Sequence, residues 1–274
     1  MLMLEKLYDN IDNILGVVTN AAKAVMEIYK TKIEVGIKPD ATPVTNADII
    51  SHDIICQGLL SLFPEIPIVS EESEISIKSP PNTDFFWLLD PIDGTKNFIA
   101  KYDAGFSINL GFIDRGVPVF GVLCLPALGE LYYTLRGNVF KLCDNFCVNK
   151  IIPKMLAETS MLNLIVSSRS SDLEIDRFLK AFDNYNKKVM VIPSAIKYCY
   201  FLQTQSSIIA YFVKTYEWDS AAGHALLNTF GAKVLCKTGN ELKYGKPGFK
   251  NNVMMCIHSN MYDAATVHSL LELL

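Results

Sequence analysis

The chain has 274 residues, of which 50% are hydrophobic and 20% are charged, and its formal net charge is −4. Disordered chains are poor in apolar residues and highly charged, so this composition excludes a disordered protein. The negative charge argues against binding to a nucleic-acid polymer, which needs a basic surface. No apolar run reaches the ~18 residues of a membrane span, and no secretory signal begins the chain. We therefore expect a cytoplasmic protein without a transmembrane segment.

The first part of the chain is predicted to be helical. Apolar residues recur at helical spacing from Leu4 to about Lys30, which predicts one long amphipathic helix. A break over residues 38–43 precedes a second helix, which starts at Thr45 and ends before Pro64. Two short apolar runs predict buried strands that lead into carboxylates: Ile66–Val69 and Phe85–Leu89.

The middle of the chain has the pattern of β hairpins, with turns predicted at residues 114–116 and 136–138. Its predicted strands are Phe106–Ile113, Val117–Leu125, Leu131–Leu135 and Val139–Leu142.

After Lys150 strands and helices alternate. The predicted strands are Leu164–Ser167, Val189–Ile192, Ile208–Phe212, one near Val234, and Val253–Ile257. The predicted helices are Leu173–Phe182, Ala195–Gln203, Asp219–Phe230 and Ala264–Leu273. The order along the chain is helices, then an antiparallel meander, then β–α units, which predicts a layered α/β fold (α+β layered). We expect two halves, residues 1–148 and 149–274.

One short segment carries most of the chemistry. An apolar strand ends in Asp90, and Asp93 follows across a bend fixed by Pro91. Two carboxylates held together repel unless one is protonated or a cation lies between them, and their oxygens suit Mg²⁺ or Mn²⁺. The amides of Gly94 and Thr95, at a helix start, offer an anion site. The alternative is an ordinary turn in which Asp93 caps the helix.

Three further acidic positions have competing interpretations. Glu71 and Glu72 follow a buried strand, where the alternative is a solvated acidic loop. Asp219 precedes a helix rich in small residues, where the alternative is an N-cap. Asp48 lies three residues after Thr45, which is the spacing of a capping box.

Together these motifs resemble a known family. Asp90-Pro-Ile-Asp93-Gly-Thr95, an upstream Glu-Glu and a downstream Trp-Asp-Ser-Ala-Ala-Gly are similar to the inositol monophosphatase family of Mg²⁺-dependent, lithium-sensitive phosphatases. The resemblance covers nearly the whole chain and implies the αβαβα sandwich of inositol monophosphatase and fructose-1,6-bisphosphatase. Within the family, three segments resemble the bacterial 3′(2′),5′-bisphosphate nucleotidases: Lys96 after the Gly-Thr, residues 218–225, and residues 193–199.

The resemblance also implies roles for individual residues. The metal ligands would be Glu71, Asp90, Asp93, Asp219 and the carbonyl of Ile92, holding two or three Mg²⁺, whereas Glu72 would not be a direct ligand. Thr95, paired with Asp48, would position the attacking water, and the amides of Gly94 and Thr95 would hold the phosphate.

The implied substrate is a small phosphorylated molecule, with 3′-phosphoadenosine 5′-phosphate or its 5′-phosphosulfate form favoured. Its nucleoside side would contact Ser194 and Lys197, in a pocket apart from the carboxylates. Ser170 and Ser171 lie where the nucleotidases carry a Ser-His pair, and Lys214 lies roughly in place of an arginine. These two departures predict weaker binding of the nucleotide.

The residues leave other functions open. Asn97 is more similar to the inositol phosphatases, so inositol monophosphate or a sugar phosphate is the alternative substrate. A haloacid-dehalogenase-type phosphatase fits worse, because its two aspartates are separated by one residue, whereas two separate Asp90 from Asp93. A binding protein without turnover is the alternative from another class. The sequence does not decide whether the chain forms a homodimer or contacts the inner membrane peripherally.

The cysteines and histidines suggest little chemistry. Seven cysteines, mostly in apolar runs, predict buried thiols rather than a disulfide framework. Cys143 and Cys147 are close, but their spacing is poor for zinc. His224 lies five residues after Asp219, off its helical face, which predicts a packed histidine.

Overall fold

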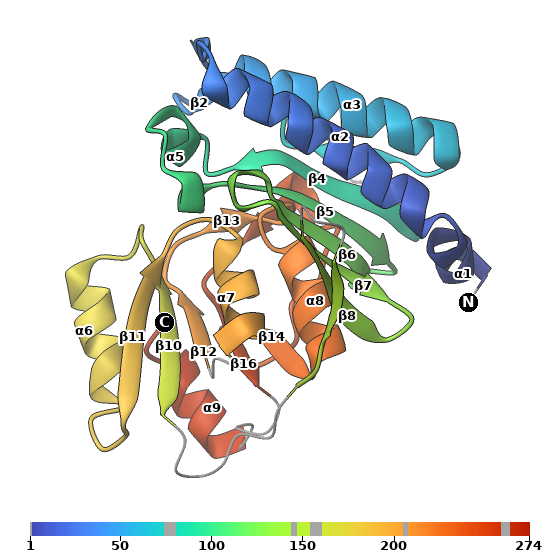
Figure 1. Ribbon diagram of the computed structural model, residues 1–274. Helices are drawn as coiled ribbons and strands as arrows, with labels where there is room; N and C mark the ends of the chain where they lie inside the picture. Colours follow the sequence, from blue (N-terminus) through green and yellow to red (C-terminus); the bar gives the residue numbers. More distant parts are fainter. Residues whose placement is uncertain (1, 74–80, 144–146, 154–160, 205–207, 259–263) are drawn as a thin grey trace.

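A computed structural model of the chain describes residues 2–73, 81–143, 147–153, 161–204, 208–258 and 264–274. Helices and sheets alternate in layers (Figure 1). The N-terminal helices cover a seven-stranded sheet, two helices lie between this sheet and a five-stranded sheet, and two more helices cover the far face of the second sheet. This arrangement confirms the predicted αβαβα sandwich.

The outer layer consists of α1 (Leu2–Asp9), α2 (Ile11–Lys30) and α3 (Asn46–Leu62). The prediction of one continuous helix over residues 4–30 is wrong at Asn10, where the backbone leaves the helical region with φ −105° and ψ 16°. The side chain of Asn10 donates a hydrogen bond to the Lys6 carbonyl at 2.9 Å, and such side-chain bonds compete with helical ones. The segment predicted as a break, residues 38–43, connects the two strands of a small hairpin, β1 (Val35–Ile37) and β2 (Pro43–Thr45).

The first sheet has the strand order β3-β4-β5-β6-β7-β8-β9, in which β3 and β4 are parallel and the other pairs antiparallel. Both predicted turns are confirmed, since Arg115 and Gly116, and likewise Arg136 and Gly137, have the positive φ angles of a tight hairpin turn. The strands are β3 (Ile68–Ser70), β4 (Phe85–Asp93), β5 (Ser107–Asp114), β6 (Val117–Leu125), β7 (Glu130–Leu135), β8 (Asn138–Cys143) and β9 (Val148–Ile151).

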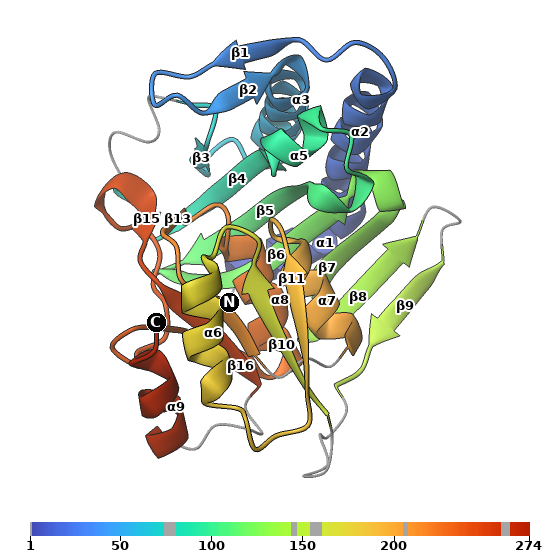
Figure 2. The same ribbon diagram turned by 90° about the vertical axis from the view of Figure 1, so that its left-hand side faces the viewer.

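The second sheet has the order β11-β10-β12-β16-β14. Its strands are β10 (Leu162–Ser167), β11 (Lys187–Ile192), β12 (Ile208–Tyr211), β14 (Ala232–Cys236) and β16 (Met254–His258). The helices α7 (Ile196–Thr204) and α8 (Ala221–Phe230) lie between the sheets, and α6 (Asp172–Lys180) and α9 (Ala264–Leu271) lie outside (Figure 2). The short elements are α5 (Thr95–Ile99), β13 (Thr215–Tyr216), β15 (Lys250–Asn251) and the 3₁₀ turns Asp103–Gly105, Pro126–Leu128 and Pro247–Phe249.

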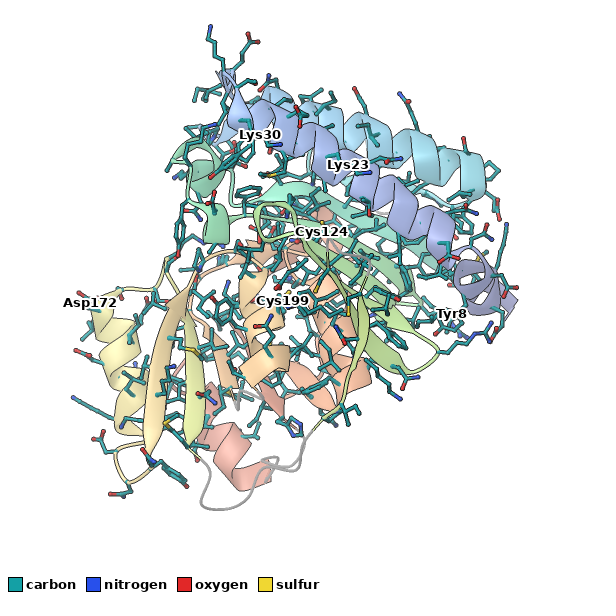
Figure 3. The ribbon with its side chains drawn as sticks, in the orientation of Figure 1. Tyr8, Lys23, Lys30, Cys124, Asp172 and Cys199 are labelled. Carbon is teal, nitrogen blue, oxygen red and sulfur yellow. The ribbon has the colours of Figure 1, made fainter. Side chains whose placement is uncertain are left out.

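Side chains that alternate along the strands divide the core into three clusters: one between the outer helices and the first sheet, one around α7 and α8 between the two sheets, and one between the second sheet and its outer helices. Trp87 and Leu89 of β4 face α2 and α3, whereas Phe86 and Leu88 face the middle layer. Cys124 accordingly lies beneath α2 and Cys199 in the middle layer (Figure 3).

The division into two halves at residue 148 stays a prediction. The strand β9, at their junction, pairs with β8 of the first sheet. None of the described helices is both long and apolar enough to cross a membrane.

Small residues let α8 approach the first sheet closely. A Cβ added at Gly111 would lie 2.7 Å from the Cβ of Ala221, and one added at Gly121 would lie 2.5 Å from the carbonyl oxygen of Ala222. The helix begins at Ala221 rather than at the predicted Asp219, which lies in the preceding turn. This close packing brings the turn with Asp219 toward β4.

Candidate functional site

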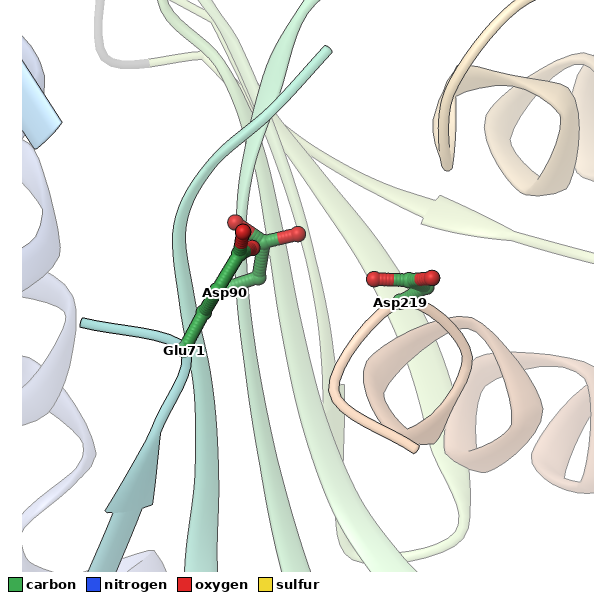
Figure 4. A group of neighbouring side chains, drawn as sticks. All are labelled: Glu71, Asp90 and Asp219. Carbon is green, nitrogen blue, oxygen red and sulfur yellow. The ribbon is translucent and has the colours of Figure 1, made fainter. Parts of the chain in front are cut away.

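The parallel pairing of β3 and β4 sets two carboxylates side by side. Ser70 lies opposite Leu89, and the N–H of Glu71 donates to the Leu89 carbonyl at 3.1 Å, so Glu71 emerges next to Asp90. The turn before α8 supplies Asp219 from the other half of the chain (Figure 4). Oxygens of these three carboxylates all lie within 4.8 Å of one another. Three segments distant in sequence thus form one acidic cluster, which we call the carboxylate cluster.

A β-bulge follows Asp90 and directs the carboxylate of Asp93 toward the residues before α7. β4 has one extra residue relative to β5 between Asp90 and Asp93, at the position where Pro91 cannot donate to the sheet. The N–H of Ile92 instead donates to the Asp90 carboxylate at 3.1 Å. Asp93 accepts a hydrogen bond from the N–H of Ala195, before α7, and its charge raises the pKa of both Asp90 and Asp219. Its role as a metal ligand stays a prediction.

Burial and mutual repulsion make the carboxylate cluster hard to ionise. Burial raises the pKa of Asp90 well above its ordinary value, and the charges of Glu71, Asp93 and Asp219 raise it further. Burial likewise raises the pKa of Asp219, with Asp93 and Glu71 adding to the shift. Such a concentration of oxygen ligands and negative charge fits a hard divalent cation.

Asp48 forms the predicted capping box and also reaches Thr95, while its role toward an attacking water stays a prediction. One carboxylate oxygen accepts hydrogen bonds from the N–H of Thr45 at 2.7 Å and from its hydroxyl at 2.6 Å, which confirms the capping box. The other oxygen lies 3.2 Å from the hydroxyl of Thr95, which also reaches the Ile92 carbonyl at 3.1 Å. Asp48 is only 1% exposed, and burial raises its pKa. The predicted Asp48–Thr95 pair is therefore present beside Asp90.

Gly94 makes the tight turn between β4 and α5. Its φ is +93°, which favours glycine, and a Cβ there would lie 2.4 Å from the carbonyl oxygen of Gly105. Asn97 holds the same carbonyl through its side-chain amide at 2.8 Å. The Gly94 and Thr95 amides thus follow directly after the two aspartates, and their role toward phosphate stays a prediction.

The two residues predicted to contact the nucleoside lie close to Gly94 and Asp93, and their role toward the substrate stays a prediction. A Cβ at Gly94 would come within 3.3 Å of the Cβ of Ser194. Lys197 is 3% exposed, donates to the carbonyl of Ser194 and lies 4.7 Å from the centre of the Tyr211 ring. Burial lowers the pKa of Lys197 to about 8, against the opposing charge of Asp93.

The other three residues predicted to contact the substrate, Ser170, Ser171 and Lys214, differ in their burial and in their hydrogen bonds. Ser170 has a buried hydroxyl without a hydrogen-bond partner within the described structure. Ser171 caps α6 in a capping box with Glu174, so its hydroxyl is already engaged. This Ser-x-x-Glu pattern is visible in the sequence and could have been recognised there. Lys214 is exposed between β12 and β13.

Sequence reasoning missed two cations near the site. Lys38, on the loop of the β1–β2 hairpin, forms ion pairs with Glu71 at 2.8 Å and with Glu72 at 2.6 Å. Burial raises the pKa of Glu72 to about 7 even so. Arg169 follows β10, and its charge acts to lower the pKa of both Asp93 and Asp219. No local pattern identifies Lys38, whereas Arg169 lies directly before Ser170 and Ser171, in a segment of the sequence already predicted to contact the substrate.

His224 is confirmed as a packed histidine: it is fully buried, and its Nδ1 lies 3.0 Å from the Tyr244 hydroxyl.

Comparison with known proteins places this site in a family. The inositol monophosphatase family matches residues 8–269. A 3′(2′),5′-bisphosphate nucleotidase CysQ from Buchnera aphidicola is 34% identical over 85% of this chain and 87% of its own length. The CysQ of Shigella flexneri is 33% identical over 89% of this chain and 99% of its own.

Solved structures share the fold. CysQ from Bacteroides thetaiotaomicron aligns with a TM-score of 0.77 and 24% identity over 92% of this chain and 98% of its own. An IMPase/NADP phosphatase solved with Mg²⁺ and phosphate aligns with a TM-score of 0.75 and 18% identity over 99% of this chain and 96% of its own. The chain therefore belongs to the inositol monophosphatase family and is a phosphatase of that family.

Proposed function

We propose that the chain is a Mg²⁺-dependent phosphatase that removes the 3′-phosphate of 3′-phosphoadenosine 5′-phosphate or of its 5′-phosphosulfate form. The carboxylate cluster carries this proposal, because its three oxygen ligands come from separate segments and lie within 4.8 Å of one another. The similarity to the CysQ relatives, which are 3′(2′),5′-bisphosphate nucleotidases, supports the choice of substrate.

The residues present fit a divalent metal. Glu71, Asp90 and Asp219 would hold it. Burial, and after it the neighbouring carboxylates, raises the pKa values of Asp90 and Asp219, and a cation would neutralise that shared negative charge. A bound Mg²⁺ supplies a water of lowered pKa and neutralises charge on the phosphoryl oxygens. Phosphoryl transfer depends mainly on positioning and charge neutralisation, so it needs no cysteine or histidine nucleophile.

The Asp48–Thr95 pair would orient the attacking water. The hydroxyl of Thr95 can donate to Asp48, which leaves the lone pairs of the Thr95 oxygen to accept a hydrogen bond from water. Asp48 is fixed in place by Thr45, so the pair is preorganised by the start of α3. The same capping box that starts the helix thus holds the proposed catalytic group.

A nucleoside bisphosphate carries a second phosphate, which needs a cation beyond the scissile group. Arg169 is exposed, follows the carboxyl end of β10 and acts electrostatically on Asp93, Asp219 and Lys197. We assign the second phosphate to Arg169 and Lys197, with Ser194 beside them. This assignment replaces the predicted dependence on Ser171, whose hydroxyl caps α6. The cytoplasmic location and a homodimer stay predictions.

Metal-induced stabilisation tests the proposed site without relying on turnover. Adding Mg²⁺ to wild-type protein should raise the melting temperature and start phosphate release from the adenosine bisphosphate. Asp90→Asn should abolish both effects, while raising the melting temperature without metal because carboxylate repulsion is relieved. Asp84→Asn, at an exposed carboxylate just before the same strand, is the matched control. A normal Mg²⁺ response in folded Asp90→Asn protein would remove the metal assignment.

A further inference from the structure

Two cysteines face each other at the end of the β8–β9 hairpin. Leu142 pairs with Val148 in antiparallel register, so the next residues toward the turn, Cys143 and Cys147, are opposite one another. The N–H of Cys143 donates to the carbonyl of Cys147 at 3.2 Å. Directly opposite residues of an antiparallel pair project from the same face of the sheet. Both thiols therefore belong to one face of one hairpin, with three residues between them in sequence.

This pairing suits a disulfide. Opposite residues that exchange backbone hydrogen bonds have Cα atoms about 5.5 Å apart, within the roughly 4.4–6.8 Å range of disulfides. Their Cβ atoms are typically about 4.5–5.5 Å apart, so closing the bond draws them together by about 1 Å. Disulfides that are exposed or strained are reduced more readily than other disulfides. The geometry thus favours a reversible bond over a permanent structural one.

The other cysteines lack this combination of access and a facing thiol. The expectation that the thiols are buried holds for Cys124, Cys199 and Cys256 but is wrong for Cys147, which is exposed. Cys56 is half-buried, and burial raises its pKa to about 11, which disfavours the reactive thiolate. Cys236 is half-buried too but lies opposite Met254.

Cys143 is reachable from a second direction. It lines a cavity of about 440 Å³ between α2 and the strands β6, β7 and β8, which Lys23 and Lys30 also line. Zinc does not explain the pair, because zinc takes four ligands. In the described ranges, the one group of three or more metal-ligating side chains is the carboxylate cluster.

We propose that Cys143 and Cys147 are a reversible redox modification site, oxidised by a low-molecular-weight disulfide. The thiolate of exposed Cys147 attacks one sulfur of that disulfide, so one small thiolate leaves and a mixed disulfide forms on Cys147. The thiolate of Cys143 then attacks the Cys147 sulfur and releases the second small thiol. The two protein thiols together lose two electrons and two protons, and the small disulfide takes up both pairs to become two thiols.

The modification should act on the hairpin and not on turnover. β3, which leads to Glu71, and β9, which follows Cys147, are the opposite edges of the seven-stranded sheet. Closing the short loop restricts the unfolded chain, so the oxidised protein should melt at a higher temperature. Phosphate release should be unchanged. Phosphatase activity and disulfide formation are therefore separate measurements. The proposed function can be refuted by the first while the redox site is confirmed by the second.

The test is incubation of the full-length folded protein with oxidised glutathione, followed by thiol counting and intact mass. Wild-type protein should lose two thiols, decrease in mass by about 2 Da for the two hydrogens removed, and recover both thiols with dithiothreitol. Peptide mapping should place the bond between Cys143 and Cys147. Cys143→Ser should instead retain one glutathione on Cys147, and Cys236→Ser, the matched control, should behave as wild type.

Two results would overturn the proposal. One is a wild-type protein that carries glutathione on Cys147 while Cys143 still reacts with maleimide. The other is retention of all thiols by wild-type protein in oxidised glutathione.

Discussion

Replacing Thr95 by valine separates the catalytic role of the Asp48–Thr95 pair from the structural role of Asp48. Valine keeps the shape of threonine but removes the hydroxyl, which lies 3.2 Å from one oxygen of Asp48. The other oxygen keeps both hydrogen bonds from Thr45. The loss of one hydrogen bond to a buried charged group should cost about 1.5–3 kcal/mol. For a chain of this length this lowers the melting temperature by roughly 3–12 °C.

Turnover should fall much further than stability does. A positioned acid–base group contributes about 10²–10⁴-fold, so Thr95→Val should lower kcat by that factor. Thr45→Ala is the comparison variant: it removes the side-chain cap and its hydroxyl bond to Asp48, at about 0.5–2 kcal/mol, but keeps the backbone N–H that donates to Asp48, so its turnover should fall much less than that of Thr95→Val. The assay is phosphate release at saturating Mg²⁺ and substrate, with melting followed in parallel. The reasoning fails if Thr95→Val turns over within about tenfold of wild type, or if Thr45→Ala loses as much activity.

Arg169→Ala should lower kcat/KM for the adenosine bisphosphate by about 10–100-fold in a steady-state assay, because a charge-assisted contact is lost. Arg177→Ala, at another exposed arginine, is the control and should leave kcat/KM unchanged. Equal effects of the two substitutions would refute the assignment of Arg169. Burial lowers the pKa of His224 below 6.5, so the unfolded chain binds more protons in acid. His224 therefore contributes a loss of unfolding free energy as pH drops from about 7 to 5, of at most about 1.4 kcal/mol per unit, while the raised pKa values of Asp90, Asp219 and Glu72 act with the opposite sign. The difference in slope between wild type and His224→Gln in denaturant titrations isolates the histidine, and identical slopes would contradict the prediction. Gly94→Ala should lower both melting temperature and turnover, because a Cβ there meets the Gly105 carbonyl oxygen at 2.4 Å; unchanged values for both would contradict this.

Local sequence patterns predicted most of the fold because each relies on short-range physics. Hydrophobic alternation identified the strands on both sides of the site, and the Thr45–Asp48 spacing identified a cap that the structure contains. Two-residue strands such as β13 and β15 are too short to show a period. At Asn10 the backbone leaves the helical region and the side chain bonds to the Lys6 carbonyl, while the apolar spacing continues across the break.

The candidate site was predictable where strands end in carboxylates and not where loops meet. Glu71 and Asp90 follow buried strands, so their chemistry is visible in the sequence. That Asp93 faces Ala195 depends on the bulge at Pro91 and on the position of α7, which only the packed structure fixes. The contact of Lys38 with Glu71 joins two loops through tertiary packing, for which a single sequence contains no signal.

The ratio of kcat/KM for 3′-phosphoadenosine 5′-phosphate to that for inositol 1-phosphate tests the proposed function most directly. Both should be measured with the same protein at saturating Mg²⁺ and again after chelation. A metal-dependent enzyme with Arg169 and Lys197 placed for a second phosphate should favour the adenosine compound, release its 3′-phosphate and leave adenosine 5′-monophosphate. Preference for inositol 1-phosphate, or phosphate release that persists without a divalent metal, would contradict it.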